Sequence, residues 1–153
     1  MHWGPEESHR GGFLAELAAF VSARDGSGPA LLWPECDPTA GDGGPERDLG
    51  PALADALAGR LGRAVLRLPA GPPAATVTRL RSGRRELVVV QESGASGIEV
   101  APDPPDRDTE PLALRLLRGE VLYLPPGSHA VLRHRPGTRH VLLEIAARPA
   151  GTR

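Results

Sequence analysis

Lysine and asparagine are absent from this sequence, and cysteine and tyrosine each occur once. Every one of the 18 basic residues is therefore an arginine, which excludes Schiff-base chemistry and a lysine nucleophile. The single cysteine, Cys36, rules out an intrachain disulfide and argues against a thiolate metal cluster. We therefore expect a reducing, cytoplasmic location.

Long apolar runs and a strong excess of one charge are also lacking. No run approaches the roughly 18 apolar residues of a membrane span, and no basic stretch followed by an apolar one indicates a signal peptide. The formal net charge of −1 gives no bulk electrostatic reason to expect nucleic acid or an anionic membrane as a partner. We expect a soluble protein that binds neither, with one hydrophobic core in its 153 residues.

Two stretches have the apolar spacing of helices. Phe13 to Ala23 carries an apolar stripe, and Leu49 to Leu61 repeats a leucine every four residues before Gly62, which suits a helix C-cap. The polar residues Met1 to Gly12 are expected to form a mobile arm. Pro34 to Arg47 is rich in Gly, Pro and acidic residues and predicts a loop.

Short strand-like runs bounded by Gly and Pro fill the remainder of the chain. Glu86 to Gln91 (ELVVVQ) has the strongest strand character because it is rich in β-branched residues. Pro136-Gly137 is a turn dipeptide between two such runs, His129 to Arg133 and His140 to Ile145, and predicts a hairpin. The order of elements indicates a mainly β (α+β) domain with N-terminal helices and a barrel or sandwich. The other predicted strands are 29–33, 64–68, 75–81, 98–100, 112–116 and 121–124.

Two stretches resemble the JmjC-type cupins, and within them the bacterial ribosomal-oxygenase-like branch. Leu53 to Gln91 is similar to that family's succession of helix, strand, Pro-rich turn, first metal motif and "VVQ" strand. Gly119 to His129, GEVLYLPPGSH, resembles the family's G-D-x-L-Y-x-P-x-G-W-x-H, and RHVLLEI resembles its closing strand. The resemblance implies a small double-stranded β-helix, the cupin jelly roll. We expect it over residues 49–147 with its leading helix, after an N-terminal arm, helix and loop (1–48) and before a frayed tail (148–153).

Enzymes of this family are Fe(II)- and 2-oxoglutarate-dependent hydroxylases that bind iron through a His-x-Asp pair and a later His. The matching positions here are Arg81, Gly83 and Ala130, with His129 one residue short of the last. Arginine has no free lone pair, and glycine and alanine have no donor atom in their side chains. The resemblance therefore implies the scaffold without the standard iron site, and no cofactor is expected.

The main hypothesis is a metal-independent barrel that binds a small anionic ligand or a protein partner. The candidate ligand-binding residues are Arg81, Gln91 and Tyr123. Arg81 would bind an anion if it points into the barrel mouth, and the competing interpretation is a solvated turn residue. For Tyr123 the competing interpretation is core packing with a satisfied hydroxyl.

Two other functions stay open. One is a divergent Fe(II)/2-oxoglutarate oxygenase whose metal is held by His129, His140 and an unidentified third ligand, if the two histidines meet across the predicted hairpin. The other is a metal-free cupin isomerase or cyclase. The resemblance also implies that the barrel forms a homodimer.

Overall fold

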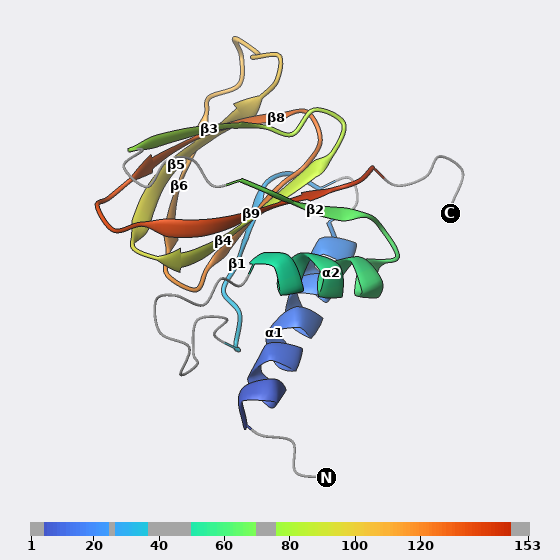
Figure 1. The fold of residues 1–153 in the computed structure, drawn as a ribbon. Coiled ribbons are helices and arrows are strands. Elements are labelled where there is room, and N and C mark those ends of the chain that lie inside the picture. Colours follow the sequence, from blue (N-terminus) through green and yellow to red (C-terminus); the bar gives the residue numbers. More distant parts are fainter. Residues whose placement is uncertain (1–4, 25–26, 37–49, 70–75, 148–153) are drawn as a thin grey trace.

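A computed structural model describes residues 5–24, 27–36, 50–69 and 76–147 (Figure 1). The helices are α1 (Pro5–Ser22) and α2 (Gly50–Leu61). The first four strands are β1 (Ala30–Leu32), β2 (Val65–Leu68), β3 (Val77–Arg81) and β4 (Glu86–Ser93). The remaining strands are β5 (Ala95–Pro102), β6 (Leu112–Leu117), β7 (Val121–Leu124), β8 (Ser128–His134) and β9 (Arg139–Ile145).

The strands form two antiparallel sheets. One has the order β1-β7-β4-β9-β2 and the other β3-β8-β5-β6. If β2 is counted as the first strand and β9 as the eighth, the sheets read 6-3-8-1 and 2-7-4-5, with β1 added at one edge. That order is the double-stranded β-helix, or jelly roll. The predicted fold class, a mainly β jelly-roll barrel with N-terminal helices, is therefore confirmed.

The five-stranded sheet is the middle layer of the molecule. The second sheet covers one of its faces, and α1 and α2 cover the other (Figure 1). Alternate residues of β4 take part in two cores: Val88 and Val90 face the helices, and Leu87 and Val89 lie between the sheets. The apolar run of this strand is continuous because both of its faces are buried.

Helix α1 begins earlier than its apolar stripe suggests. The prediction of a mobile arm is wrong from residue 5 onward, because 5–12 belong to α1. The sequence Pro5-Glu6-Glu7 suits a first helical turn, since proline is accepted there and acidic residues favour the helix N-terminus. Leu17 packs beside Leu57 of α2 in the core on the five-stranded sheet. The N-terminal segment therefore shares a core with the barrel.

The predicted hairpin between residues 129–133 and 140–145 is wrong. β8 pairs with β3 and β5, whereas β9 pairs with β2 and β4, so Pro136-Gly137 joins the two sheets. The connection between the predicted strands 86–91 and 98–100 is also shorter than expected. Gly94 alone makes it, with φ of 76°, and β5 begins at Ala95. A turn dipeptide marks where a chain reverses but does not determine which strands then pair.

The α2 prediction is confirmed, and Gly62 ends this helix with φ of 64° while its N–H donates to the carbonyl oxygen of Ala58 at 2.9 Å. No helix in the described part of the chain is both long and apolar enough to cross a membrane. Three predicted segments fall at least partly outside the described residues: most of the loop over 34–47, the Pro-rich turn within 70–75 and the tail 148–153.

Candidate functional site

Arg81 does not point into the barrel. On β3, Thr78 and Leu80 face the five-stranded sheet, so Arg81 faces outward, and its side chain is 73% exposed. Its Nε lies 3.9 Å from Oδ2 of Asp103. The condition under which Arg81 would bind a ligand in the barrel mouth is therefore not met.

His129 and His140 do not meet. His129 pairs with Arg81 and Ala101 and shares their outward face, whereas His140 pairs with Gln91 and faces the barrel interior. Ala130 does face the interior, where the resemblance would place a third ligand, but it has no donor atom. No group of three or more His, Cys, Asp or Glu residues that could hold a metal occurs in the described ranges. The residues that the structure describes do not fit an Fe(II) facial triad.

Gln91 lies at one end of the barrel interior, among polar side chains from both sheets. It is fully buried, and its Nε2 donates to Oγ of Ser96 at 3.1 Å. Ser96 Oγ is 2.7 Å from Nδ1 of His134, whose Nε2 is 2.8 Å from Oγ1 of Thr78. The ring of His140 stacks on that of His134, with the ring centroids 5.1 Å apart. We call these five residues the interior polar cluster.

Two atoms of the interior polar cluster are buried without a hydrogen-bond partner in the described part of the chain: Oε1 of Gln91 and Nε2 of His140. Burial lowers the pKa of both His134 and His140, and for His140 the neighbouring His134 lowers the pKa further. Both nitrogens of His134 are engaged by hydroxyl groups, so only His140 offers an unengaged nitrogen. The cluster is therefore poorly suited to bind a metal ion. The ligand-binding role of Gln91 stays a prediction.

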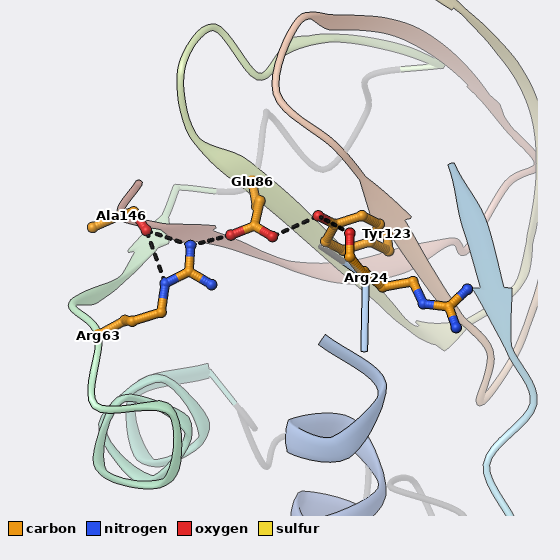
Figure 2. A network of polar contacts seen from close by, with 5 residues as sticks. All are labelled: Arg24, Arg63, Glu86, Tyr123 and Ala146. Atoms are coloured by element: carbon orange, nitrogen blue, oxygen red, sulfur yellow. Dashed lines mark hydrogen bonds and ion pairs between the residues drawn. The ribbon is translucent and has the colours of Figure 1, made fainter. Parts of the chain in front are cut away.

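Tyr123 lies on the opposite side of the five-stranded sheet, under the helices and outside the barrel interior. Its ring packs edge-on against Phe20 of α1 with the centroids 6.2 Å apart. The hydroxyl donates to Oε1 of Glu86 at 2.5 Å, and the carbonyl oxygen of Arg24 is 3.5 Å away (Figure 2). The prediction that Tyr123 contacts a ligand inside the barrel is therefore wrong, because its side chain lies on the other face of β7. The apolar run VLYL is buried on both faces, so its sequence does not reveal which side chains point inward.

Glu86 connects Tyr123 to Arg63. The other carboxylate oxygen of Glu86 accepts a hydrogen bond from Nη2 of Arg63, and Arg63 also donates from Nε to the carbonyl oxygen of Ala146 at 3.1 Å (Figure 2). The side chains of Arg63 and Glu86 are only 10% and 6% exposed, so this is a nearly buried ion pair. Sequence reasoning missed it, because nothing in the sequence links two residues that lie on an α2–β2 connection and at the start of β4.

A pocket of about 530 Å³ opens above this network. Its lining includes Arg63, Glu86 and Tyr123, together with Arg84 from the β3–β4 turn and the prolines of the turn after β7. Glu86 is the one carboxylate among the lining residues and is already engaged by two donors. The guanidinium of Arg24, another lining residue, points away from Glu86 (Figure 2). It lies over the ring of Phe20, with Cζ 5.1 Å from the ring centroid.

The cations of the pocket are not all neutralised. Nε and Nη2 of Arg63 donate to Ala146 and Glu86, whereas Nη1 has no hydrogen bond with the described residues (Figure 2). The exposed Arg84 has no hydrogen bond or ion pair with any residue that the structure describes. Guanidinium groups bind carboxylates and phosphates through paired, charge-assisted hydrogen bonds. The pocket is therefore suited to an anion.

Comparison with known proteins assigns neither a family nor an activity to this chain. No family model matches the sequence, and no curated protein sequence matches it. Solved structures with a similar fold include the ribosomal oxygenase YcfD from Escherichia coli, at 17% identity and a TM-score of 0.39 over 47% of this chain and 20% of that one. The TDP-quinovose 3,4-ketoisomerase WlaRB from Campylobacter jejuni matches at 16% identity and 0.41, over 57% and 65% of the two chains. The CENP-C cupin domain of Drosophila melanogaster matches at 12% identity and 0.36, over 54% of each chain.

Each of these matches spans less than two thirds of the other protein. The three proteins are of different kinds, and likenesses of this size assign none of their activities to this chain. The chain has the cupin-type jelly-roll fold, as its own strand order shows. Neither an activity nor a JmjC-type origin follows from that fold.

Proposed function

We propose that this chain is a cupin-fold binding domain that holds a small anionic ligand without a metal, in the pocket lined by Arg63 and Arg84. The observation that carries the proposal is the imbalance of charge around the pocket. Its single carboxylate among the described residues, Glu86, is taken up by Arg63 and Tyr123, while Nη1 of Arg63 and the whole guanidinium of Arg84 are not engaged by that part of the chain. A carboxylate or a phosphate group would accept hydrogen bonds from both arginines.

The size and the rest of the lining suggest the remainder of the ligand. A volume of about 530 Å³ lies in the range of small-molecule pockets. Pro125 and Pro126 add an apolar wall beside the arginines. We therefore expect a ligand with one acidic group and a compact apolar body, such as an aryl carboxylate or an aryl phosphate.

We further propose that the scaffold derives from the JmjC-type cupins and that its iron site has been lost. The similar sequence stretches support this origin. Ala130, which faces the interior without a donor atom, supports the loss, whereas Arg81 lies on the outer face. The alternative of a divergent Fe(II)/2-oxoglutarate oxygenase requires a donor set that His129 and His140 do not form. The cytoplasmic location and the homodimer stay predictions.

Titration calorimetry with benzoate and with phenyl phosphate tests the proposal. Arg84→Gln should weaken binding of the preferred probe about tenfold or more, because it removes a charge-assisted hydrogen bond. Arg60→Gln is the matched control, since Arg60 is exposed on α2 and does not line the pocket. Binding that Arg84→Gln leaves unchanged, or no binding of either probe by the wild type, would refute this pocket as the anion site.

A further inference from the structure

The second sheet presents a face that no helix or strand of the described chain covers (Figure 1). Outward-pointing residues on its four strands alternate with the residues of the barrel core. The charged residues among them, together with Gly97, we call the arginine face: Arg79, Arg81, Gly97, Glu99, Arg115 and Arg133. Apolar side chains such as Val77, Val131 and Leu117 share the same side of the sheet.

The arginine face concentrates positive charge on a chain whose formal net charge is −1. It holds four arginines and one acidic residue, the exposed Glu99. Arg81 forms a long ion pair with Asp103, with Nε 3.9 Å from Oδ2, and no hydrogen bond with it. Arg79, Arg115 and Arg133 are exposed and have no hydrogen bond or ion pair with the described residues. The concentration of charge thus comes from where the fold places these arginines and does not follow from their number in the sequence.

The centre of the face is a gap between two arginines. Gly97 pairs with Arg133 on one side and with Arg115 on the other, so the two arginines stand on strands about 10 Å apart with no side chain between them. A Cβ added at Gly97 would meet nothing within 4 Å. An extended backbone has room to lie along β5 at this point.

The spacing along the strands selects the kind of partner. Arg79 and Arg81 are two residues apart on β3, which is about 6.6 Å, the distance between alternate side chains of an extended peptide. Single-stranded nucleic acid is held by basic grooves that also carry aromatic side chains on which the bases stack. The arginine face has no aromatic residue of that kind; its nearest ring is the imidazole of His129 beside Arg81.

We propose that the arginine face docks an extended acidic segment of a partner protein, with alternate carboxylates paired to its arginines. The segment would lie over Gly97 between Arg115 and Arg133. This inference is independent of the anion pocket, which lies on the helix-covered side of the other sheet.

Fluorescence anisotropy with a labelled peptide of alternating Glu and Ser tests the proposal, at low and at high salt. The double variant Arg79→Glu/Arg133→Glu should weaken binding by about a hundredfold, because each charge-assisted hydrogen bond that is removed should weaken it about tenfold. Arg60→Glu/Arg85→Glu makes the same change of charge at exposed positions, on α2 and beside Glu144 of β9 in the other sheet, and should change binding by less than about threefold. Circular dichroism verifies that each variant is folded.

A second variant separates shape from charge. Gly97→Val should also weaken binding by about tenfold, because it fills the gap with a residue that a strand accepts and leaves every charge in place. The proposal is overturned if the control double variant weakens binding as much as the face variant, or if the wild type does not bind the peptide at low salt. It is also overturned if an oligouridylate binds more tightly than the peptide and depends on the same two arginines.

Discussion

Gln91 and His140 are Cα partners on β4 and β9, and each has one buried polar atom without a hydrogen-bond partner in the described chain. Both side chains face the end of the barrel interior at which His134, Ser96 and Thr78 form a connected set of hydrogen bonds. A buried unsatisfied polar atom destabilises a fold by about 1–3 kcal/mol. A change in protonation at this end of the barrel should therefore change the stability of the fold.

The free energy of unfolding should decrease as the pH falls from 7 to 5. The native pKa values of His134 and His140 lie below the ordinary value of about 6.5, mainly because the rings are buried. Between the native and the ordinary value, the unfolded chain binds more protons than the native one, so acid favours unfolding. Urea titrations across this pH range measure the effect.

The contribution of the interior polar cluster is isolated by substitution. His140→Gln should reduce the steepness of the decrease, because one titrating ring is removed from the cluster. His129→Gln removes a histidine from the outer face and serves as the matched control, with a slope close to that of the wild type. A wild type that becomes more stable towards pH 5, or a His140→Gln variant with an unchanged slope, would contradict the prediction.

Glu86→Gln should lower the free energy of unfolding by about 3 kcal/mol, because it leaves the nearly buried guanidinium of Arg63 without its counter-ion. Glu144→Gln is the matched control. Glu144 pairs with Arg85, whose side chain is 54% exposed, so its replacement should change stability by less than about 1 kcal/mol. Chemical denaturation of both variants compares them directly, and equal effects would show that the Arg63–Glu86 pair contributes no more than a surface pair.

The two faces of the five-stranded sheet should contribute comparably to stability. Leu122→Ala empties space between the sheets and Leu143→Ala empties space under the helices, and each should cost about 2–5 kcal/mol. Leu66→Ala, on β2, removes a side chain that is 57% exposed and should cost less than about 1 kcal/mol. Thermal unfolding measures all three. If Leu143→Ala were as mild as Leu66→Ala, the packing of α1 and α2 on the sheet would be wrong.

The sequence predicts the elements of this fold better than their partners. The leucine repeat of α2 and the β-branched run of β4 each indicate a local structure, and both are found where expected. The partners of β8 and β9 were not predictable from Pro136-Gly137, because these two successive strands belong to different sheets of the jelly roll. The same turn residues can join two strands of one hairpin or two strands of different sheets.

The candidate site was predictable only in part, for a related reason. Alternation shows which side chains share a face when one face is polar, as on β3, where Arg79 and Arg81 face outward and Leu80 faces inward. It fails on β7, whose faces are both apolar, so Tyr123 was expected on the wrong side. The ion pair of Arg63 with Glu86 and the stack of His134 on His140 depend on long-range packing and leave no local signal in the sequence.

Anaerobic titration with Fe(II), with and without 2-oxoglutarate, should show no stoichiometric binding at His129 and His140. The two side chains lie on strands of different sheets, one facing outward and one inward, so no single ion can contact both. His129→Ala and His140→Ala should accordingly leave any residual metal uptake unchanged. His134→Ala is a third variant, which removes the ring that stacks on His140. One equivalent of iron that disappears in either His129→Ala or His140→Ala would overturn the metal-independent assignment, and its disappearance in both would require a rearranged barrel.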